Sequence, residues 1–461
     1  MNATTLTAET SATTNPRVQK DTGAALKFIT CGSVDDGKST LIGRLLVDSR
    51  SVLQDQLANV SKSGAADLAL FTDGLSAERE QGITIDVAYR YFNTVHRKFI
   101  IGDAPGHEQY TRNMVTAASS ADAAVVLVDA TKLDWKNQAL ELLAQTRRHS
   151  LLVNLLRVPS IVFAVNKLDA LEDASKPETE GQAAVAFANI SHALEVFAKA
   201  AGIEITAIVP ISALIGHNVV EPTADWCNYA GPSLLQILEQ LPTTPAETET
   251  PFAFPVQWVE KFSSSSDTSQ GRRIFWGRVA TGVIQVGQQI KVLPSGQSAT
   301  VAQVLTHTRR PGNVRAGHSA GIVLDREVDV SRGDWLLASE PTAEQAEDDF
   351  DVKPGIFDAS RDLKATIAWM DDEPLIAGRV YLALHGHRWI KAKVKRIVHR
   401  LDINTLAEED ASQLSANSIG HVELTLQEAI ATLPYSQSRV LGSLVLVDTA
   451  SHKTAGAVLI N

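Results

Sequence analysis

A glycine-rich run between Gly32 and Ser39 carries the clearest chemical signal in the sequence. The run reads G-x-x-x-x-G-K-[ST], follows a short apolar segment and precedes leucines at helical spacing. Glycines let backbone N–H groups converge on phosphate oxygens, and a helix that begins here adds a positive potential. Lys38 is expected near the β- and γ-phosphates and the Ser39 hydroxyl on Mg²⁺, while Asp35 and Asp36 either tune cation binding or are simply solvated. The predicted phosphate-binding residues are Gly32, Ser33, Val34, Asp35, Asp36, Gly37, Lys38, Ser39, Thr40, Asp103 and Gly106.

A second polar run, Asp103-Ala104-Pro105-Gly106, comes directly after the apolar residues Phe99–Ile101. A carboxylate at the end of a strand can hold Mg²⁺ through water. Gly106 lets its backbone N–H approach a γ-phosphate closely because no Cβ intervenes. Alone this run is also an ordinary turn, but its place after a phosphate-binding loop favours a nucleotide site.

Two single residues complete the predicted reaction centre. His107 follows Gly106 and is expected to orient an attacking water, although a lone histidine is more often structural. Thr84 is expected to bind Mg²⁺ only while the γ-phosphate is present, with an ordinary strand residue as the alternative. The predicted catalytic residues are His107, Thr84 and Lys38, and the predicted metal ligands are Ser39, Thr84 and Asp103.

A third run, Asn166-Lys167-Leu168-Asp169, also follows an apolar segment of strand length. Guanine presents N1–H and its 2-amino group side by side, and one carboxylate accepts both hydrogen bonds. Adenine has an acceptor at the ring position, so Asp169 selects guanine. The stem of Lys167 can cover a face of the base, and backbone N–H groups near Ser212 can reach guanine O6. The predicted guanine-binding residues are Asn166, Lys167, Asp169, Ser212, Ala213 and Leu214.

The sequence around these runs alternates between strand and helix patterns over residues 25–241. Apolar runs of strand length are Leu26–Cys31, Phe99–Ile101, Ala123–Val128, Ser160–Val165 and Ile205–Pro210, and Ile83–Val95 alternates as a half-buried strand. Continuous apolar strands separated by helices predict a mostly parallel sheet with helices on both faces.

The pattern changes near Leu241, where the Pro- and Thr-rich run LPTTPAETETP indicates a linker. Short, glycine-punctuated strands follow, which predicts two β-barrel domains over 251–345 and 352–461. The acidic stretch near 342–354 marks the break between them. Residues 1–24 are polar and Thr-rich, and we expect a disordered tail there.

Composition excludes several classes of protein. The chain has 461 residues, 44% of them hydrophobic, which fits a multidomain globular protein rather than a disordered one. Its formal net charge of -11 argues against nucleic acid as a partner. Two cysteines form no disulfide framework, and no apolar run is long enough for a membrane helix. We therefore expect a cytoplasmic protein without a membrane partner.

These runs, in this order, resemble those of the translational GTPases. Three longer strings are similar to one branch, the large GTP-hydrolysing subunit of bacterial sulfate adenylyltransferase: CGSVDDGKSTLIGRLL over 31–46, AEREQGITIDVAYRYF over 77–92 and PGHEQYTRNM over 105–114. The resemblance implies a P-loop GTPase domain followed by two β-barrels, as in elongation factor 1A. It implies GTP and Mg²⁺ as cofactors, Thr84 as the switch threonine and His107 as the residue that positions water.

The resemblance also implies a partner. In that family a separate small subunit forms adenosine 5′-phosphosulfate and pyrophosphate from ATP and sulfate, and coupled GTP hydrolysis drives this unfavourable reaction. The expected assembly is a heterodimer or larger. An elongation factor 1A-like carrier of aminoacyl-tRNA is the alternative, and a nucleotide-binding scaffold without turnover is a third reading. Lys132–Ala144 is longer than the family's usual link at this point and lies near the second switch.

Overall fold

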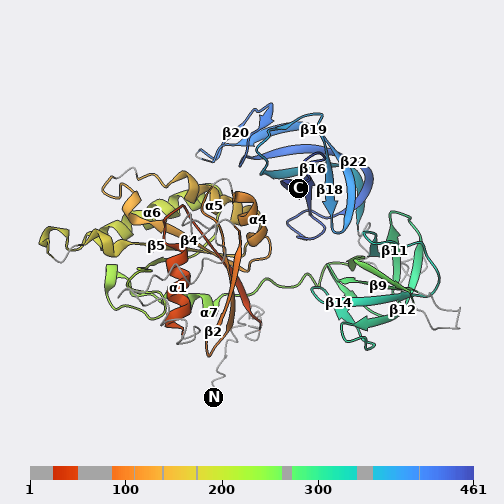
Figure 1. The fold of residues 1–461 in the computed structure, drawn as a ribbon, viewed down its shortest axis with the longest axis horizontal. Coiled ribbons are helices and arrows are strands. Elements are labelled where there is room, and N and C mark those ends of the chain that lie inside the picture. The colour runs from red at the N-terminus through yellow and green to blue at the C-terminus, as the bar shows by residue number, and fades with distance from the viewer. Residues whose placement is uncertain are drawn as a thin grey trace, which may run out of the picture.

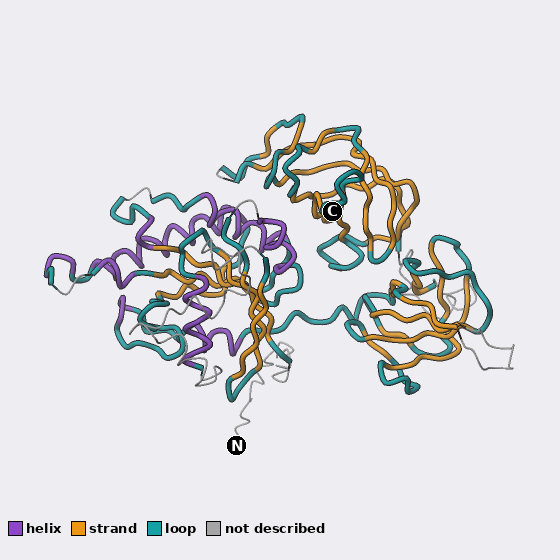
Figure 2. Tube along the Cα trace, in the orientation of Figure 1, coloured by secondary structure: helices purple, strands orange, loops and turns teal. Residues whose placement is uncertain are grey.

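The computed structural model describes residues 24–49, 86–107, 110–137, 140–172, 175–261, 273–339, 357–403 and 405–461. An α/β unit is joined by an extended link to two further units in this part of the chain (Figure 1). Figure 2 shows that these two units are built from strands and loops wherever the chain is described. Thr84, residues 1–23 of the predicted tail over 1–24, and the predicted break near 342–354 lie outside the described residues.

The sheet of the α/β unit has the strand order β2-β3-β1-β4-β5-β6. All neighbouring strands are parallel except β2 and β3, which are antiparallel. Every residue of β4 and β5 is buried, as strands covered on both faces require. The strands are β1 (Leu26–Cys31), β2 (Ala88–Asn93), β3 (Lys98–Asp103), β4 (Ala123–Asp129), β5 (Ser160–Asn166) and β6 (Ile205–Pro210).

The predicted strand Ile83–Val95 is too long at its C-terminal end. The chain turns after Asn93, where the Thr94 N–H donates to the Arg97 carbonyl over 2.9 Å. Val95 lies in this turn and is 94% exposed. The alternation of apolar residues continues through the turn, so it does not show where pairing with β3 ends.

Helices cover both faces of the sheet. Helix α1 begins after Gly37, whose φ of 91° favours glycine, and it packs Leu41 and Leu45 with α7 against one face. Helices α4, α5 and α6 pack against the opposite face. The helices are α1 (Lys38–Asp48), α4 (Thr111–Ala118), α5 (Ala144–Leu155), α6 (Gln182–Ala201) and α7 (Leu234–Gln240), and short 3₁₀ turns are η4 (Ala130–Lys132), η5 (Leu168–Leu171), η6 (Pro177–Thr179) and η7 (Trp226–Asn228).

The first strand-rich unit contains a sheet of order β7-β15-β11-β12-β14-β9-β8. Strands β7 and β8 follow one another in the chain but lie at opposite edges of this sheet. β7 pairs with β15 and β8 pairs with β9, so the chain between them brings the two edges together. The strands are β7 (Ala253–Pro255), β8 (Trp258–Lys261), β9 (Arg273–Arg278), β10 (Val283–Ile284), β11 (Gln289–Leu293), β12 (Ser298–Thr306), β13 (Val314–Arg315), β14 (Ser319–Leu324) and β15 (Trp335–Ala338).

The second strand-rich unit is a closed barrel. Strands β18, β23, β24, β16, β22 and β19 pair in that order, and β19 pairs with β18 again. Closure leaves these strands without a free edge. The strands are β16 (Asp358–Trp369), β17 (Leu375–Ile376), β18 (Val380–His385), β19 (Arg388–Leu401), β20 (Glu408–Glu409), β21 (Gln413–Leu414), β22 (Ile419–Thr432), β23 (Ser443–Val447) and β24 (Thr454–Ile460).

The closed barrel contacts both other units. Its Tyr435 hydroxyl donates to the Leu156 carbonyl over 3.0 Å, and the apolar core of the α/β unit extends to Met370. On another side, Arg388 forms an ion pair of 2.7 Å with Asp334 of the first strand-rich unit. The predicted fold class, an α/β domain followed by β-barrel structure, is confirmed. None of the helices in the described ranges is long and apolar enough to cross a membrane.

Candidate functional site

The predicted nucleotide residues gather at one edge of the α/β sheet. Parallel strands β1, β4, β5 and β6 point their carboxyl ends to the same edge, and ligands of such sheets bind there. Strand β1 leads into the glycine loop and β3 into Asp103. Strand β5 leads into Asn166, and β6 leads toward Ser212. The topology therefore assembles runs that lie far apart in the sequence.

Lys38 lies at the centre of the glycine loop. Its ammonium donates to the Ser33 carbonyl over 2.7 Å and to the Gly32 carbonyl over 3.3 Å. Burial lowers the pKa of Lys38, and the nearby charges of Asp103 and Asp36 oppose that shift. A Cβ at Gly106 would lie 2.5 Å from the Lys38 Nζ. The structure thus brings the lysine and Gly106 together, and only glycine fits at 106 without displacing the lysine.

Asp36 is held inside the loop. Its Oδ2 accepts from the Ser33 N–H over 2.6 Å, and its Oδ1 lies 2.9 Å from the Lys132 Nζ. Burial raises the pKa of Asp36, and the contact with Lys132 opposes that rise. Lys132 also donates to the Val34 carbonyl. Of the two interpretations kept for Asp36, simple solvation does not describe this buried and paired carboxylate.

Lys132 was not among the predicted site residues. It ends η4, directly after β4, and is the first residue of the Lys132–Ala144 segment. Its position after a strand of the same parallel sheet was the available signal, because every such strand end points to the nucleotide edge.

The predicted metal ligands belong to two elements of this edge. Asp103 is 2% exposed and accepts a hydrogen bond of 3.3 Å from the Thr30 hydroxyl. Ser39 is half-buried in the first turn of α1. A carboxylate and a hydroxyl fit Mg²⁺, which usually takes few protein oxygens and completes its shell with phosphates and water. Among the described residues, no cluster of three or more His, Cys, Asp or Glu side chains could hold an ion by itself.

His107 lies in the bend after Gly106 and is half-buried. Its carbonyl accepts from the Tyr110 N–H over 3.1 Å, and the two rings lie 6.3 Å apart in an edge-on arrangement. These contacts involve the carbonyl and the ring of His107. The observation that bears on water activation is its position directly after Gly106, which lies against Lys38. Thr84, its predicted companion, lies outside the described residues.

The guanine motif is tied to the glycine loop. The Asn166 amide donates to the Asp36 carbonyl over 2.8 Å and accepts from the Ala213 N–H over 3.0 Å. The Lys167 ammonium donates to the Asp35 carbonyl over 2.5 Å and lies 2.8 Å from Asp129. One asparagine thus joins three loops.

The remaining guanine residues lie around this bridge. Asp169 is half-buried in η5, which begins after Lys167 with φ 63°. The buried Ser212 hydroxyl accepts from the Ile215 N–H over 3.0 Å, and Leu214 is 68% exposed. The hydroxyl of Ser212 therefore shapes its own loop, while Asp169 is the carboxylate of the motif in reach of solvent.

Helix α5 contributes two further residues that the sequence analysis missed. The Nδ1 atom of His149 accepts from the Gly32 N–H over 3.1 Å, and Gln145 donates to the Gly106 carbonyl over 3.2 Å. Burial, with a smaller effect of the Lys38 charge, lowers the pKa of His149 to about 3. The imidazole is therefore neutral at pH 7, as an acceptor must be. The run QTRRH at the start of α5 gave no sign of this contact by spacing alone.

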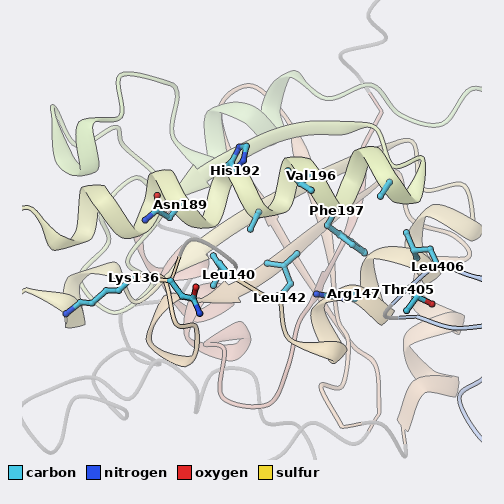
Figure 3. Close-up of a pocket in the computed structure, with 13 residues that line it drawn as sticks. Lys136, Leu140, Leu142, Arg147, Asn189, His192, Val196, Phe197, Thr405 and Leu406 are labelled. Carbon is cyan, nitrogen blue, oxygen red and sulfur yellow. The ribbon is translucent and has the colours of Figure 1, made fainter.

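A separate pocket of about 640 Å³ lies away from these loops (Figure 3). Residues of the long Lys132–Ala144 segment, of α6 and of the closed barrel line it, among them Leu140, Phe197 and Leu406. None of the predicted nucleotide residues lines this pocket. The long segment thus contributes Lys132 to the nucleotide edge and packs its middle part toward the barrel.

The geometry of the edge is that of a P-loop nucleotide-binding domain with a guanine motif. Residues 24–244 match the family model "Elongation factor Tu GTP binding domain", and residues 362–461 match "GTP-eEF1A C-terminal domain-like". The fold and the site therefore define a GTP-binding protein of the elongation factor type.

Relatives narrow this class. "Sulfate adenylyltransferase subunit 1" of Laribacter hongkongensis is 42% identical over 95% of this chain and 86% of its own length. The protein of the same name from Aeromonas hydrophila is 42% identical over 94% and 86%. "Bifunctional enzyme CysN/CysC" of Xylella fastidiosa is 42% identical over 95% of this chain and 66% of that protein. The chain belongs to the sulfate adenylyltransferase subunit 1 family, which confirms the resemblance and disfavours the aminoacyl-tRNA carrier.

Proposed function

We propose that this chain is the GTP-hydrolysing subunit of a sulfate adenylyltransferase. In this proposal it couples GTP hydrolysis to the formation of adenosine 5′-phosphosulfate and pyrophosphate by a small partner subunit. The printed name of its relatives, "subunit 1", implies an assembly with another subunit. The observation that carries the GTPase part is the convergence of Lys38, Gly106 and Asn166 at one sheet edge.

GTP is the proposed ligand of this edge. Lys38 would move its ammonium from loop carbonyls to the β- and γ-phosphates, and the N–H groups at the start of α1 would add positive potential. Asp169 would accept both guanine donors, with Lys167 along the base and Ala213 near O6. Asp36, Asn166 and Lys132 support this binding because they hold the loops in one arrangement.

Mg²⁺ is the proposed metal. Ser39 and Asp103 would hold it, with Thr84 as a third oxygen donor, and the ion would neutralise charge on the phosphates. Gly106 would donate its N–H to the γ-phosphate, since only hydrogen occupies the place of a side chain there. His107 would orient the water that attacks the γ-phosphorus in line with the departing GDP.

Coupling to sulfate activation is tested with the product of the partner. A small adenylyltransferase subunit, ATP and sulfate are incubated with GTP and this chain, and adenosine 5′-phosphosulfate is measured over time. We expect product to accumulate well beyond the level reached without GTP, and to return to that level with Lys38→Ala. The same low product level with and without GTP and this chain would contradict the proposal.

A further inference from the structure

The outer face of strand β18 is apolar, which is unusual for a barrel strand in contact with water. Tyr381, Ala383 and His385 point inward and are buried. The alternate residues Val380, Leu382 and Leu384 point outward, yet each is apolar. Val380 is 40% exposed, and the other two are half-buried. Strands that are apolar at both faces are normally covered on both faces.

The neighbouring strand β19 adds an exposed tryptophan and a row of lysines. Its residues alternate between buried and exposed positions, and Trp389, Lys391 and Lys393 share the exposed face. Trp389 is 55% exposed. The pairing of β18 with β19 sets Leu384 beside Trp389, Leu382 beside Lys391 and Val380 beside Lys393. These six residues form one surface, which we call the β18–β19 face.

The charge of the β18–β19 face is positive and uncompensated. Within the described part of the chain, the ammonium groups of Lys391 and Lys393 take part in no hydrogen bond or ion pair. Carboxylates near the two ends of the hairpin are already paired with arginines. These pairs are Arg388 with Asp334 and Glu428, and Arg379 with Glu373 and Asp448. A chain of net charge -11 thus presents a cationic, apolar surface here.

The β18–β19 face is continuous with the contacts between the units. Leu384 pairs with Val445 of β23, which pairs with Ala457 of β24, and Ala457 packs against the core of the α/β unit. At the hairpin tip, Gly386 lies against Trp335 of the first strand-rich unit. A partner on this face would therefore lie beside barrel strands that contact the α/β unit and next to the hairpin tip that contacts the first strand-rich unit.

We propose that the β18–β19 face docks the small adenylyltransferase subunit through a surface with an apolar centre and a carboxylate-rich rim. This inference rests on the proposed function. An apolar patch rimmed by charge is typical of a protein interface, and a central tryptophan is the residue type that most often dominates one. A single-stranded nucleic acid would call for several stacking aromatic side chains, whereas this face has one. The lysines would speed association and make it salt-dependent.

Matched variants of the full chain test the proposal. The apolar test is Val380→Glu, and its control is Val398→Glu, since Val398 is 38% exposed on the same strand pair but outside the face. The charge test is Lys391→Glu with Lys393→Glu, and its control is Lys364→Glu with Lys453→Glu, both exposed in the same barrel. Trp389→Ala tests the central tryptophan of the β18–β19 face. Circular dichroism and thermal melting confirm that each variant is folded.

Binding of the purified small subunit is measured by titration calorimetry, and the mass of the free chain by light scattering. We expect Val380→Glu, Trp389→Ala and the charge pair each to weaken binding about tenfold or more, with both controls unchanged. Equal binding by wild type and all variants would overturn the inference while leaving the proposed function intact. Failure of the wild-type chain to bind the subunit at all would instead contradict the proposed function. If the free chain self-associates and Val380→Glu abolishes that self-association, the face binds a second copy of this chain, and the proposal that it docks the small subunit is overturned.

Discussion

The nucleotide edge of the α/β unit and the β18–β19 face of the closed barrel use charge in opposite ways. At the edge, Lys38 is 7% exposed and Asp36 is fully buried, and each is bound to backbone groups of the glycine loop. On the barrel, Lys391 and Lys393 are exposed and their ammonium groups have no partner within the described residues. The first region is built in advance to receive a ligand in one geometry. The second offers charge without a fixed geometry, as an encounter surface does.

The difference in burial predicts which substitutions have large effects and which have small ones. A buried charge that loses its partner costs much more than an exposed one, because water cannot replace the lost contact. Substitutions at the nucleotide edge should therefore change turnover or stability strongly. Substitutions at contacts between the units should change them modestly, and the following predictions test this order.

The largest effect is expected from Lys38→Ala. Removal of the ammonium at the centre of the loop should lower kcat for GTP hydrolysis about 10²–10³-fold, the usual loss when one charge-stabilising donor is removed. Lys27→Ala is the control, because its side chain is exposed on β1. Phosphate release at saturating GTP measures both, and an equal loss in the two variants would erase the distinction between buried and exposed lysines.

The second effect concerns pH. The pKa of His149 falls from its ordinary value of 6.5 to about 3 on folding. As the pH is lowered, His149 is therefore protonated in the unfolded chain before it is protonated in the folded chain. The contribution of His149 to the free energy of unfolding is therefore complete above pH 6.5. It is lost as the pH falls toward 3, by about 1.4 kcal/mol per pH unit. Urea unfolding from pH 7 to 4.5 should show this slope reduced in His149→Gln, which keeps an acceptor.

A companion variant isolates the hydrogen bond of the same side chain. His149→Phe leaves the Gly32 N–H without its acceptor and should lower the free energy of unfolding at pH 7 by about 1–3 kcal/mol. An unchanged pH slope in His149→Gln, together with a neutral His149→Phe, would show that this buried contact does not hold the glycine loop.

A third effect, of about tenfold in Kd for GTP, is expected from Lys132→Ala, because buried Asp36 then loses the ion pair that offsets its burial. The control is Lys136→Ala in the same segment, whose ammonium lies over the Trp135 ring, 4.9 Å from its centre. Fluorescent-nucleotide titration measures both. Equal affinities for GTP in the two variants would show that Lys132 does not contribute to nucleotide binding.

The smallest effect is expected at the contact between the units. Tyr435→Phe removes one hydrogen bond to the Leu156 carbonyl and should lower the free energy of unfolding by about 1 kcal/mol. GTP turnover should change less than twofold, since Leu156 lies at the C-terminal end of α5, whereas Gln145 and His149 contact the nucleotide loops from its first half. A loss of turnover as large as that of Lys38→Ala would show that this contact, too, controls the nucleotide edge.

Sequence reasoning predicted the α/β unit well, because its signals are local. An apolar run followed by a glycine loop fixes both β1 and the start of α1, and the order of the motifs fixes which strand ends meet. The β18–β19 face was missed because it depends on strand pairing, which is not a local signal. In VYLALH every residue from Val380 to Leu384 is apolar, and only the closed pairing of β18 with β19 and β23 shows which side faces out.

Residues that act through tertiary contacts were also missed. Lys132 and His149 reach the glycine loop over 96 and 117 positions in sequence, and neither spacing nor composition encodes such a distance. Their residue types gave no signal either, because a lysine is commonly a surface residue and a lone histidine is commonly a structural one. The strand end before Lys132 was the one available clue.

Phosphate release from GTP by this chain is the most direct test of coupling between the nucleotide site and sulfate activation. Release is followed with the chain alone, and again with a small adenylyltransferase subunit, ATP and sulfate. We expect strong stimulation that disappears in Lys38→Ala and in Asp169→Asn, because hydrolysis is coupled to sulfate activation through this site. Turnover that is indifferent to the subunit and its substrates would contradict it.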